Sequence, residues 1–218
     1  MKKILIISYQ FPPKSGPGIH RSKNLVKYLR EHGYEPIVLT IKEENIIKNA
    51  ENIDYSLLKE LPSDIKIIRT NSFDFASLAK FLMKIKLYRL FWFFLYPLFW
   101  EWSSMWPFFI YRKASKVVMD NDIKIIYTSS SPFSSMYLGW FLKIKYNIPW
   151  VADLRDPFTD AYAWQFPSKA HWKLSKLWEK WIFKKLDHLI VTTDELKKLY
   201  TLKGMINEDR ITVINNGY

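Results

Sequence analysis

The chain has 218 residues, of which 49% are hydrophobic and 17% aromatic, so it can bury a full core and is not a disordered chain. It contains no cysteine, which excludes disulfides and thiolate chemistry. Its formal net charge of +12 favours an anionic partner, such as nucleic acid, an acidic membrane surface or a phosphorylated small molecule. The first apolar run is too short for a signal peptide, so we expect the cytoplasm.

Seven short apolar runs predict β-strands, and segments of helical character separate most of them. Because strands and helices alternate, the connections should be right-handed crossovers in one α/β domain. We therefore expect a doubly wound, mainly parallel sheet with helices on both faces, whose ligands bind beyond the C-terminal strand ends. The predicted strands cover residues 4–8, 36–40, 65–69, 123–128, 150–153, 188–192 and 211–214.

The loop between the first strand and the following helix contains Gly16 and Gly18, two of only six glycines. Free N–H groups at a helix N-terminus favour an anion, and glycines let a phosphate or a sugar approach the backbone. His20 and Arg21 fall in the first helical turn and could add donors. A Pro/Gly loop that only turns the chain is the alternative. A dinucleotide site is disfavoured, because Arg21 replaces the third glycine of the G-x-G-x-x-G fingerprint.

Two later strand ends carry polar residues. Ser130 and Ser131 follow the fourth strand, where they predict either an N-cap for the next helix or contacts with a hydroxyl or a sugar. Asp153, Arg155 and Asp156 belong to the densest charged loop at the predicted sheet edge. They could form a structural ion pair, or a carboxylate could accept a hydrogen bond from a substrate hydroxyl or act as a base. The four histidines are scattered, so we expect no metal site.

A long aromatic insertion is expected at residues 73–119. Its uncharged stretch, residues 90–100, is about half the roughly 20 residues that a transmembrane helix needs. Trp92 beside Lys84 and Arg89 is instead the composition of a segment that lies in the headgroup region of a membrane. An apolar helical hairpin packed on the sheet is the alternative.

The predicted helix at residues 166–186 carries a stripe of lysines, with Trp172 on its flank. A lysine stripe is usually a solvated face, yet with flanking aromatic residues it also matches a helix on anionic lipid. The other side of the helix should face the core, with Leu174, Trp178, Trp181 and Ile182. No nucleic-acid motif competes, so we do not expect nucleic acid as a partner. The stripe consists of Lys169, Lys173, Lys176, Lys180 and Lys184.

Five segments together, in their order and positions, resemble the N-terminal half of a family 4 glycosyltransferase. The resemblance covers nearly the whole chain and implies a GT-B fold, in which two Rossmann-like domains face each other across a cleft. It further implies that the N-terminal domain mainly binds the acceptor, that the C-terminal domain holds the nucleotide sugar, and that transfer retains anomeric configuration without a metal. The segments are residues 9–18, 24–33, 128–132, 149–157 and 213–217.

The resemblance places Gly16 and Gly18 in the loop that approaches the donor's phosphates and the acceptor. Arg155 and Asp156 fall where many members have His-Asp, the histidine contacting the transferred sugar. Asn216 matches the start of the interdomain linker, and the glutamate pair of the family belongs to the second domain. We therefore expect this chain to be inactive without a C-terminal donor domain, in cis or in trans.

The functional expectation is an acceptor-binding domain that sits peripherally on the inner face of the cell membrane. Many members of the family attach there through basic and aromatic helices and build lipopolysaccharide, capsule or glycolipid. The acceptor would then be a lipid-linked saccharide, and the nucleotide sugar would be a substrate rather than a cofactor. The alternative is a non-catalytic, membrane-associated Rossmann-like module that binds a phosphorylated ligand or a protein partner.

Overall fold

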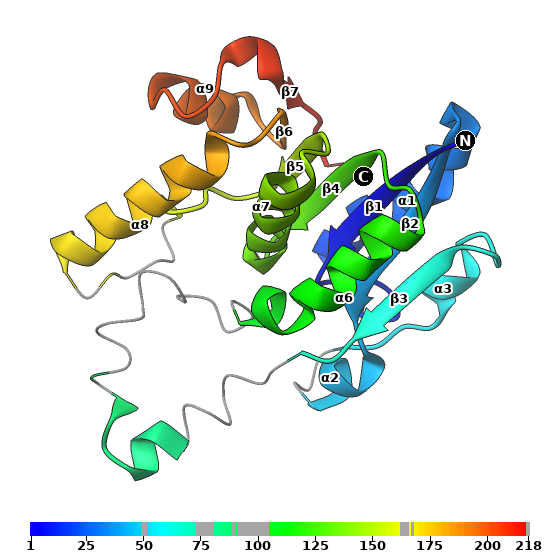
Figure 1. Cartoon of the computed structure of the whole chain (residues 1–218), viewed down its shortest axis with the longest axis horizontal. Helices are drawn as coiled ribbons and strands as arrows, with labels where there is room; N and C mark the ends of the chain where they lie inside the picture. The colour runs from blue at the N-terminus through cyan, green and yellow to red at the C-terminus, as the bar shows by residue number, and fades with distance from the viewer. Residues whose placement is uncertain are drawn as a thin grey trace.

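The computed structural model describes residues 1–48, 52–72, 81–88, 90, 105–161, 166 and 168–216. Seven parallel strands form one sheet in the order β3-β2-β1-β4-β5-β6-β7 (Figure 1). All seven predicted strands are confirmed, each end within two residues. They are β1 Lys2–Ser8, β2 Tyr34–Ile41, β3 Lys66–Thr70, β4 Ile125–Ser130, β5 Trp150–Leu154, β6 His188–Val191 and β7 Ile211–Val213.

Helices connect the strands on both sides of the sheet. The α-helices are α1 Pro17–Tyr28, α2 Glu43–Lys48, α3 Ser56–Lys59, α6 Trp106–Asp120, α7 Ser134–Tyr146, α8 Lys169–Phe183 and α9 Asp194–Leu202. Two short 3₁₀-helices are η1 Leu29–His32 and η2 Glu208–Arg210. Pro17 occupies the first position of α1, where a missing N–H does no harm. After η1 the chain turns at Gly33, whose φ of 81° is left-handed.

Strand β1 lies at the centre and pairs with both β2 and β4. Its side chains alternate between two apolar layers, as expected for a parallel sheet that is covered on both faces. Ile4 and Ile6 belong to the layer that includes Val26 of α1, whereas Leu5 and Ile7 belong to the layer of α6 and α7. The doubly wound α/β fold is therefore confirmed.

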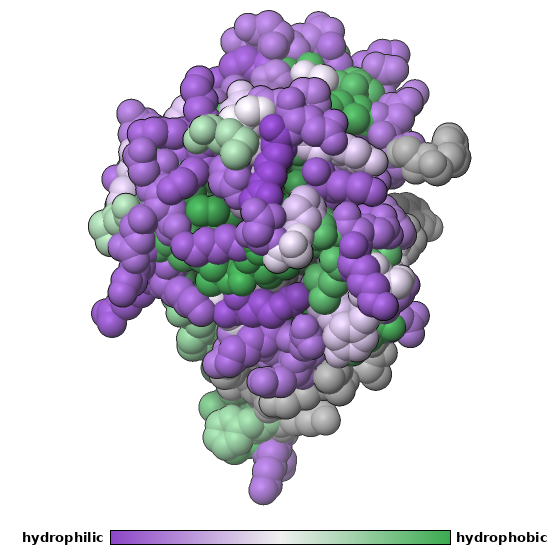
Figure 2. Space-filling model, turned by 90° about the vertical axis from the view of Figure 1, so that its right-hand side faces the viewer, coloured by the Kyte–Doolittle hydropathy of each residue, from purple (hydrophilic) through white to green (hydrophobic). Residues whose placement is uncertain are grey.

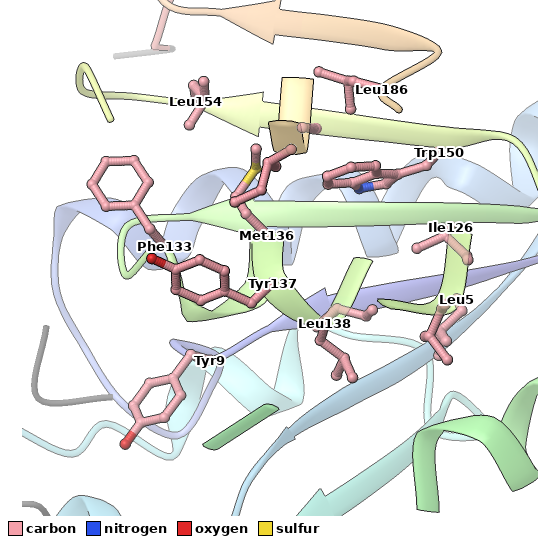
Figure 3. Close-up of a cluster of buried hydrophobic side chains, with 14 of the residues drawn as sticks. Leu5, Tyr9, Ile126, Phe133, Met136, Tyr137, Leu138, Trp150, Leu154 and Leu186 are labelled. Carbon is pink, nitrogen blue, oxygen red and sulfur yellow. The ribbon is translucent and has the colours of Figure 1, made fainter. Parts of the chain in front are cut away.

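Helix α7 packs closely on the centre of the sheet. Figure 3 shows side chains of α7, among them Met136 and Leu138, gathered with Trp150 of β5. The indole of Trp150 donates a hydrogen bond to the hydroxyl of Thr128 at 3.0 Å. A Cβ atom added to Gly139 would lie 2.6 Å from the side chains of both Thr128 and Trp150. Glycine at this position therefore sets how near the helix comes to the sheet.

Helix α8 buries only part of the predicted core side: Ile182 is buried and Trp178 packs against the core, as expected. Leu174 is 56% exposed and Trp181 is 59% exposed, so their assignment to the core is wrong. Hydrophobic periodicity placed Leu174 and Trp181 wrongly because polar residues of α8 are also buried, and a pattern of apolar residues does not identify them. The buried residues of α8 are His171, Ser175, Glu179, Ile182 and Phe183.

The predicted insertion is described only in part. Residues 106–120 form α6, which packs beside α7 and buries Trp106 and Ile110 in the core. Arg89 and Trp92 lie outside the described residues. The face seen in Figure 2 is mainly hydrophilic, with apolar residues reaching it in a band across the middle. Within the described part of the chain, none of the helices has the length and apolar character needed to cross a membrane.

Candidate functional site at the strand ends

Charged and polar side chains from several loops meet at the C-terminal ends of the strands. The loops follow β1, β4, β5 and β6, and this is the edge at which open α/β sheets bind ligands. Hydrogen bonds and one close approach to a glycine backbone join these residues. We call them the strand-end cluster: Gly18, Arg21, Tyr127, Ser130, Ser131, Asp153, Arg155 and Thr192.

Asp153 is the buried acid of the strand-end cluster, with 1% of its surface exposed. Its Oδ2 atom accepts hydrogen bonds from Arg21 Nε at 2.6 Å and from the Tyr127 hydroxyl at 2.5 Å. Its Oδ1 atom is buried and has no hydrogen-bond partner in the described part of the chain. Burial raises the pKa of Tyr127 well above its ordinary value, and the charge of Asp153 adds to this effect. Tyr127 therefore stays protonated and donates to the acid.

Arg21 links α1 to the chain after β7. Its Nη1 atom donates to the carbonyl of Ile214 at 2.8 Å and to that of Asn215 at 3.4 Å. Burial lowers the pKa of Arg21, but the hydrogen bond and charge of Asp153 outweigh burial, so the net pKa is raised. Arg21 lies in the second turn of α1, not in the first as predicted. Its guanidinium N–H groups donate to Asp153, Ile214 and Asn215 within the protein.

Arg155 joins the loops after β1, β4 and β5. Its Nε donates to the carbonyl of Ser130 at 2.8 Å, and its Nη2 donates to that of Ser131 at 2.6 Å. A Cβ atom on Gly18 would lie 1.6 Å from Arg155 Nη1. The glycine was expected to admit a ligand, yet in this structure it admits the guanidinium of Arg155. Among the described residues, no carboxylate lies within ion-pair distance of Arg155, and its pKa is lowered by burial.

Gly16 differs from Gly18 in the reason why glycine is needed. Gly16 is the N-cap of α1 and has a φ of 139°, which an L side chain rarely adopts. A Cβ atom there would meet nothing within 4 Å, so this backbone borders open space. No side chain caps the first turn of α1. The N-terminus of α1 therefore presents uncapped backbone beside the charged Arg155.

Two members of the strand-end cluster were missed from the sequence. Thr192 donates from its hydroxyl to the Arg155 carbonyl at 3.1 Å, and Tyr127 contacts Asp153. Tyr127 is a polar-tipped residue inside an apolar strand, which was the available signal. The expected serine N-cap of α7 is wrong, because Phe133 is the N-cap and makes no side-chain cap. The Ser130 hydroxyl instead donates to the Asp153 carbonyl at 2.9 Å.

The structure does not bring every predicted site residue into the strand-end cluster. Asp156 is exposed and makes no hydrogen bond among the residues that the structure describes, although its charge acts on Arg155. His20 is exposed and is not part of the cluster; it lies near Glu60, whose pKa is lowered mainly by the hydrogen bond from Lys23. No group of three or more His, Asp or Glu side chains that could hold a metal occurs in the described ranges.

A second polar cluster fastens α8 to the loop after β5 and to α9. The buried Glu179 carboxylate accepts hydrogen bonds from the hydroxyls of Thr159 and Tyr200. Lys176 is half-buried and forms an ion pair with Asp160, so its assignment to a freely solvated lysine stripe is wrong. Burial raises the pKa of Glu179 despite these hydrogen bonds. The remaining lysines of the stripe, Lys169, Lys173, Lys180 and Lys184, are exposed.

The fold matches one half of several solved enzymes. Sucrose-phosphate synthase from Thermosynechococcus elongatus is 16% identical, with a TM-score of 0.60; the match covers 100% of this chain and 49% of that one. A glycosyltransferase from Rickettsia africae is 17% identical, with a TM-score of 0.56 and coverage of 99% and 43%. UDP-GlcNAc 2-epimerase from Neisseria meningitidis, bound to UDP-GlcNAc, is 12% identical, with a TM-score of 0.54 and coverage of 99% and 46%.

The chain thus spans less than half the length of these three proteins, and its fold is the Rossmann-like half of a GT-B fold. The same fold serves transferases and an epimerase, so the fold alone does not select an activity. The model of the family named Glycosyltransferase Family 4 matches residues 21–218. This chain belongs to glycosyltransferase family 4. The comparison with curated proteins gives no match.

Proposed function

We propose that this chain is the acceptor-binding, membrane-associating N-terminal domain of a retaining glycosyltransferase. The enzyme transfers a sugar from a nucleotide sugar to a lipid-linked saccharide during synthesis of a cell-surface polysaccharide or glycolipid, on the inner face of the membrane. Family membership supports glycosyl transfer. The coverage of less than half of the solved GT-B chains supports a donor domain that acts in cis or in trans, without which this chain has no activity.

The observation that carries the proposal is the positive charge of the strand-end cluster next to the open backbone of Gly16. Arg21 is neutralised by Asp153, whereas Arg155 is held by two carbonyls and no ion pair within the described ranges. A guanidinium and an uncapped helix N-terminus both attract phosphate oxygens. A nucleotide sugar carries a diphosphate, so this edge suits the donor side of a transfer site.

Arg155 and Asp156 take separate roles in this proposal. Arg155 stands where many family members have a histidine, and we assign to it contact with the transferred sugar and stabilisation of the departing diphosphate charge. Asp156 is exposed beside it and is assigned to bind a substrate hydroxyl. The fixed guanidinium would supply the charge stabilisation that other enzymes obtain from a metal, in line with the expectation of no metal cofactor.

The membrane part of the proposal rests on the exposed side of α8. Leu177 is 57% exposed and, with Leu174 and Trp181, forms an apolar sector next to the exposed lysines. An apolar sector bordered by lysines is the composition of a helix lying in a membrane interface, where each basic residue adds about 1 kcal/mol on anionic lipid. Residues 81–88 repeat this composition, with exposed Phe81 and Met83 beside Lys84.

Transferase activity is tested by combining the chain with a GT-B donor domain, fused or separate, and measuring transfer from labelled nucleotide sugars. We expect Arg155→Gln to lower kcat/KM by about a hundredfold, as expected for the loss of a group that stabilises developing charge. Arg112→Gln, at an exposed position of α6, is the matched control. Equal activity of the two variants would remove Arg155 from the mechanism. Robust transfer by residues 1–218 alone would refute the need for a donor domain.

Membrane binding is tested by sedimentation with phosphatidylglycerol vesicles at low and high salt. Charge reversal at Lys173 and Lys180 should release the protein, and so should Leu177→Gln combined with Trp181→Gln. Charge reversal at Lys2 and Lys3, which lie at the N-terminal end of β1 and so away from the C-terminal strand ends, is the charge-matched control. Unchanged sedimentation of both α8 variants would show that α8 does not bind membrane. If the chain binds vesicles but no donor domain restores sugar transfer, the non-catalytic binding module is favoured.

A further inference from the structure

A cavity of about 440 Å³ lies at the same edge of the sheet as the strand-end cluster, but at the ends of β2 and β3. The residues that line the cavity come from the ends of β2 and β3 and from α6, whereas the strand-end cluster lies at the ends of β1, β4, β5 and β6, so the two sites share no residue. A volume of this size falls in the usual range for small-molecule sites. Its walls include Lys42, Arg69, Asn71, Ser72, Phe109 and Lys113.

Three cations from different elements converge on the cavity. Arg69, at the end of β3, donates from Nη2 to the carbonyl of Pro12 at 2.7 Å and from Nη1 to that of Ile41 at 3.2 Å. Lys113 of α6 donates from Nζ to the carbonyl of Arg69 at 3.0 Å. Lys42 follows β2, and its backbone N–H donates to Thr70 at 2.8 Å. Hydrogen bonds to backbone carbonyls thus hold the guanidinium of Arg69, the ammonium of Lys113 and the backbone of Lys42 at the cavity.

Negative charge in the protein does not balance these cations. Within the described ranges, the acid paired with them is Glu43, whose Oε1 lies 3.8 Å from Arg69 Nη2. Burial lowers the pKa of Arg69, with Glu43 opposing this effect, so a bound anion would stabilise the guanidinium. The side chains of Lys42 and Asn71 have no partner in the part of the chain that the structure describes. They are free to donate to a ligand.

The backbone around the cavity is fixed before any ligand binds. Asn45 donates to the Ser72 carbonyl at 3.1 Å and accepts from the Ser72 N–H at 3.1 Å. The hydroxyls of Ser72 and Tyr9 are 2.7 Å apart, and the Trp106 indole donates to Thr70 at 2.9 Å. Phe109 is 57% exposed and adds an aromatic face. The site therefore combines cations, an amide and an aromatic ring on a rigid support.

We propose that this cavity binds the phosphate or diphosphate group of a phosphorylated saccharide, the acceptor of the transfer reaction. Lysine and arginine donors recognise phosphate oxygens, the Asn71 amide suits a sugar hydroxyl, and the Phe109 ring suits a sugar face. Phosphate binding at Lys42, Arg69 and Lys113 follows from the charges of the cavity alone. Only the assignment of the ligand as acceptor rests on the proposed glycosyl transfer.

Calorimetry of the full chain with inorganic pyrophosphate, and with glucose 1-phosphate against glucose, tests the site. The double variant Lys42→Gln/Lys113→Gln should bind both phosphates at least about tenfold more weakly, since each lysine contributes a charge-assisted hydrogen bond. Lys2→Gln/Lys3→Gln removes the same charge on the opposite edge and should bind like the unmodified chain. In amide NMR spectra, pyrophosphate should shift Asn71, and the Lys42→Gln/Lys113→Gln variant should lose this shift while any shift of Gly18 at the strand-end cluster stays.

Three results would overturn the assignment: no phosphate binding by the unmodified chain, equal weakening in both double variants, or shifts confined to Gly18 and Arg155. Binding of phosphatidylglycerol vesicles that requires Lys42 and Lys113, without binding of glucose 1-phosphate, would also overturn it in favour of a lipid headgroup. If the double variant does not fold, Lys42→Gln alone gives the test. These assays need no donor domain, so failed sugar transfer leaves their result standing.

Discussion

Helices α7 and α8 follow successive strands of one sheet, yet they differ in how much of their apolar surface they bury. In α7 the buried residues include Met136, Leu138 and Leu142, and the helix packs against the sheet and α6. In α8 the buried face combines Ile182 and Phe183 with Glu179 and other polar groups, while Leu174, Leu177 and Trp181 are exposed. Figure 1 shows α7 across the sheet and α8 extending away from it. Helix α7 buries most of its apolar side chains, whereas α8 leaves several of its apolar side chains exposed.

The two helices meet through aromatic side chains. The rings of Trp140 in α7 and Trp178 in α8 are 5.3 Å apart, in an edge-to-face arrangement. Helix α8 is also held by Ile182 and Phe183, which are buried in the core, and by the polar cluster of Thr159, Glu179 and Tyr200. These contacts fix the position of α8 while Leu174, Leu177 and Trp181 stay exposed. The comparison thus separates the residues that stabilise the domain from those available for binding.

The largest expected difference is between leucines of the two helices. Leu138→Ala in α7 should lower the free energy of unfolding by about 3 kcal/mol, because it leaves a cavity in a packed core. Leu177→Ala in α8 should change it by less than about 0.5 kcal/mol, because the side chain is already in solvent. Urea unfolding of both variants measures this. Similar losses would mean that α8 is also a core helix.

The close approach of α7 to the sheet predicts the next effect. Gly139→Ala should destabilise the protein by about 2 kcal/mol, because the new methyl group overlaps Thr128 and Trp150. Ala170→Ser, at an exposed position of α8, provides a small-residue control with little expected change. Thermal unfolding followed by circular dichroism compares them. A neutral Gly139→Ala would show that α7 can move off the sheet freely.

The helix starts differ as well. Ser168 caps α8 by accepting a hydrogen bond from the His171 N–H, whereas α7 has no side-chain cap. Ser168→Ala should therefore cost about 1 kcal/mol of stability. Replacing Ser168 with Asp, which can also cap, should restore it. Equal stability of the Ala and Asp variants would show that the cap is not needed.

The smallest expected effect is a change in pH dependence. Because burial raises the pKa of Glu179 above its ordinary 4.5, the folded state keeps this proton at pH values where the unfolded chain has lost it. The contribution of Glu179 to stability should therefore fall as the pH rises above about 4.5. Glu179→Gln should remove this part of the slope in urea unfolding measured from pH 4.5 to 7.5. Parallel curves for the two proteins would contradict the raised pKa.

The positions and bounds of the strands could be predicted because buried parallel strands are continuous apolar runs. The gathering of polar residues at their C-terminal ends followed from topology. The hydrogen-bond partners of individual residues could not be predicted. Arg21 and Asp153, for example, are 132 positions apart, and no local pattern in the sequence pairs them. Gly18 could be recognised as a close-approach position, but the approaching group could not. The buried side of α8 was predicted only in part for a related reason: the hydroxyl groups that accompany Glu179 into the interior come from distant segments.

The central position of β1 has a consequence for how the chain folds during its synthesis. Strand β1 can pair with β2 soon after both have left the ribosome, but its other edge stays open until β4, Ile125–Ser130, has been made. An apolar strand with an unpaired edge invites pairing with other chains. Nascent chains shorter than this point should therefore depend on chaperones, and any fragment that ends before Ile125 should aggregate.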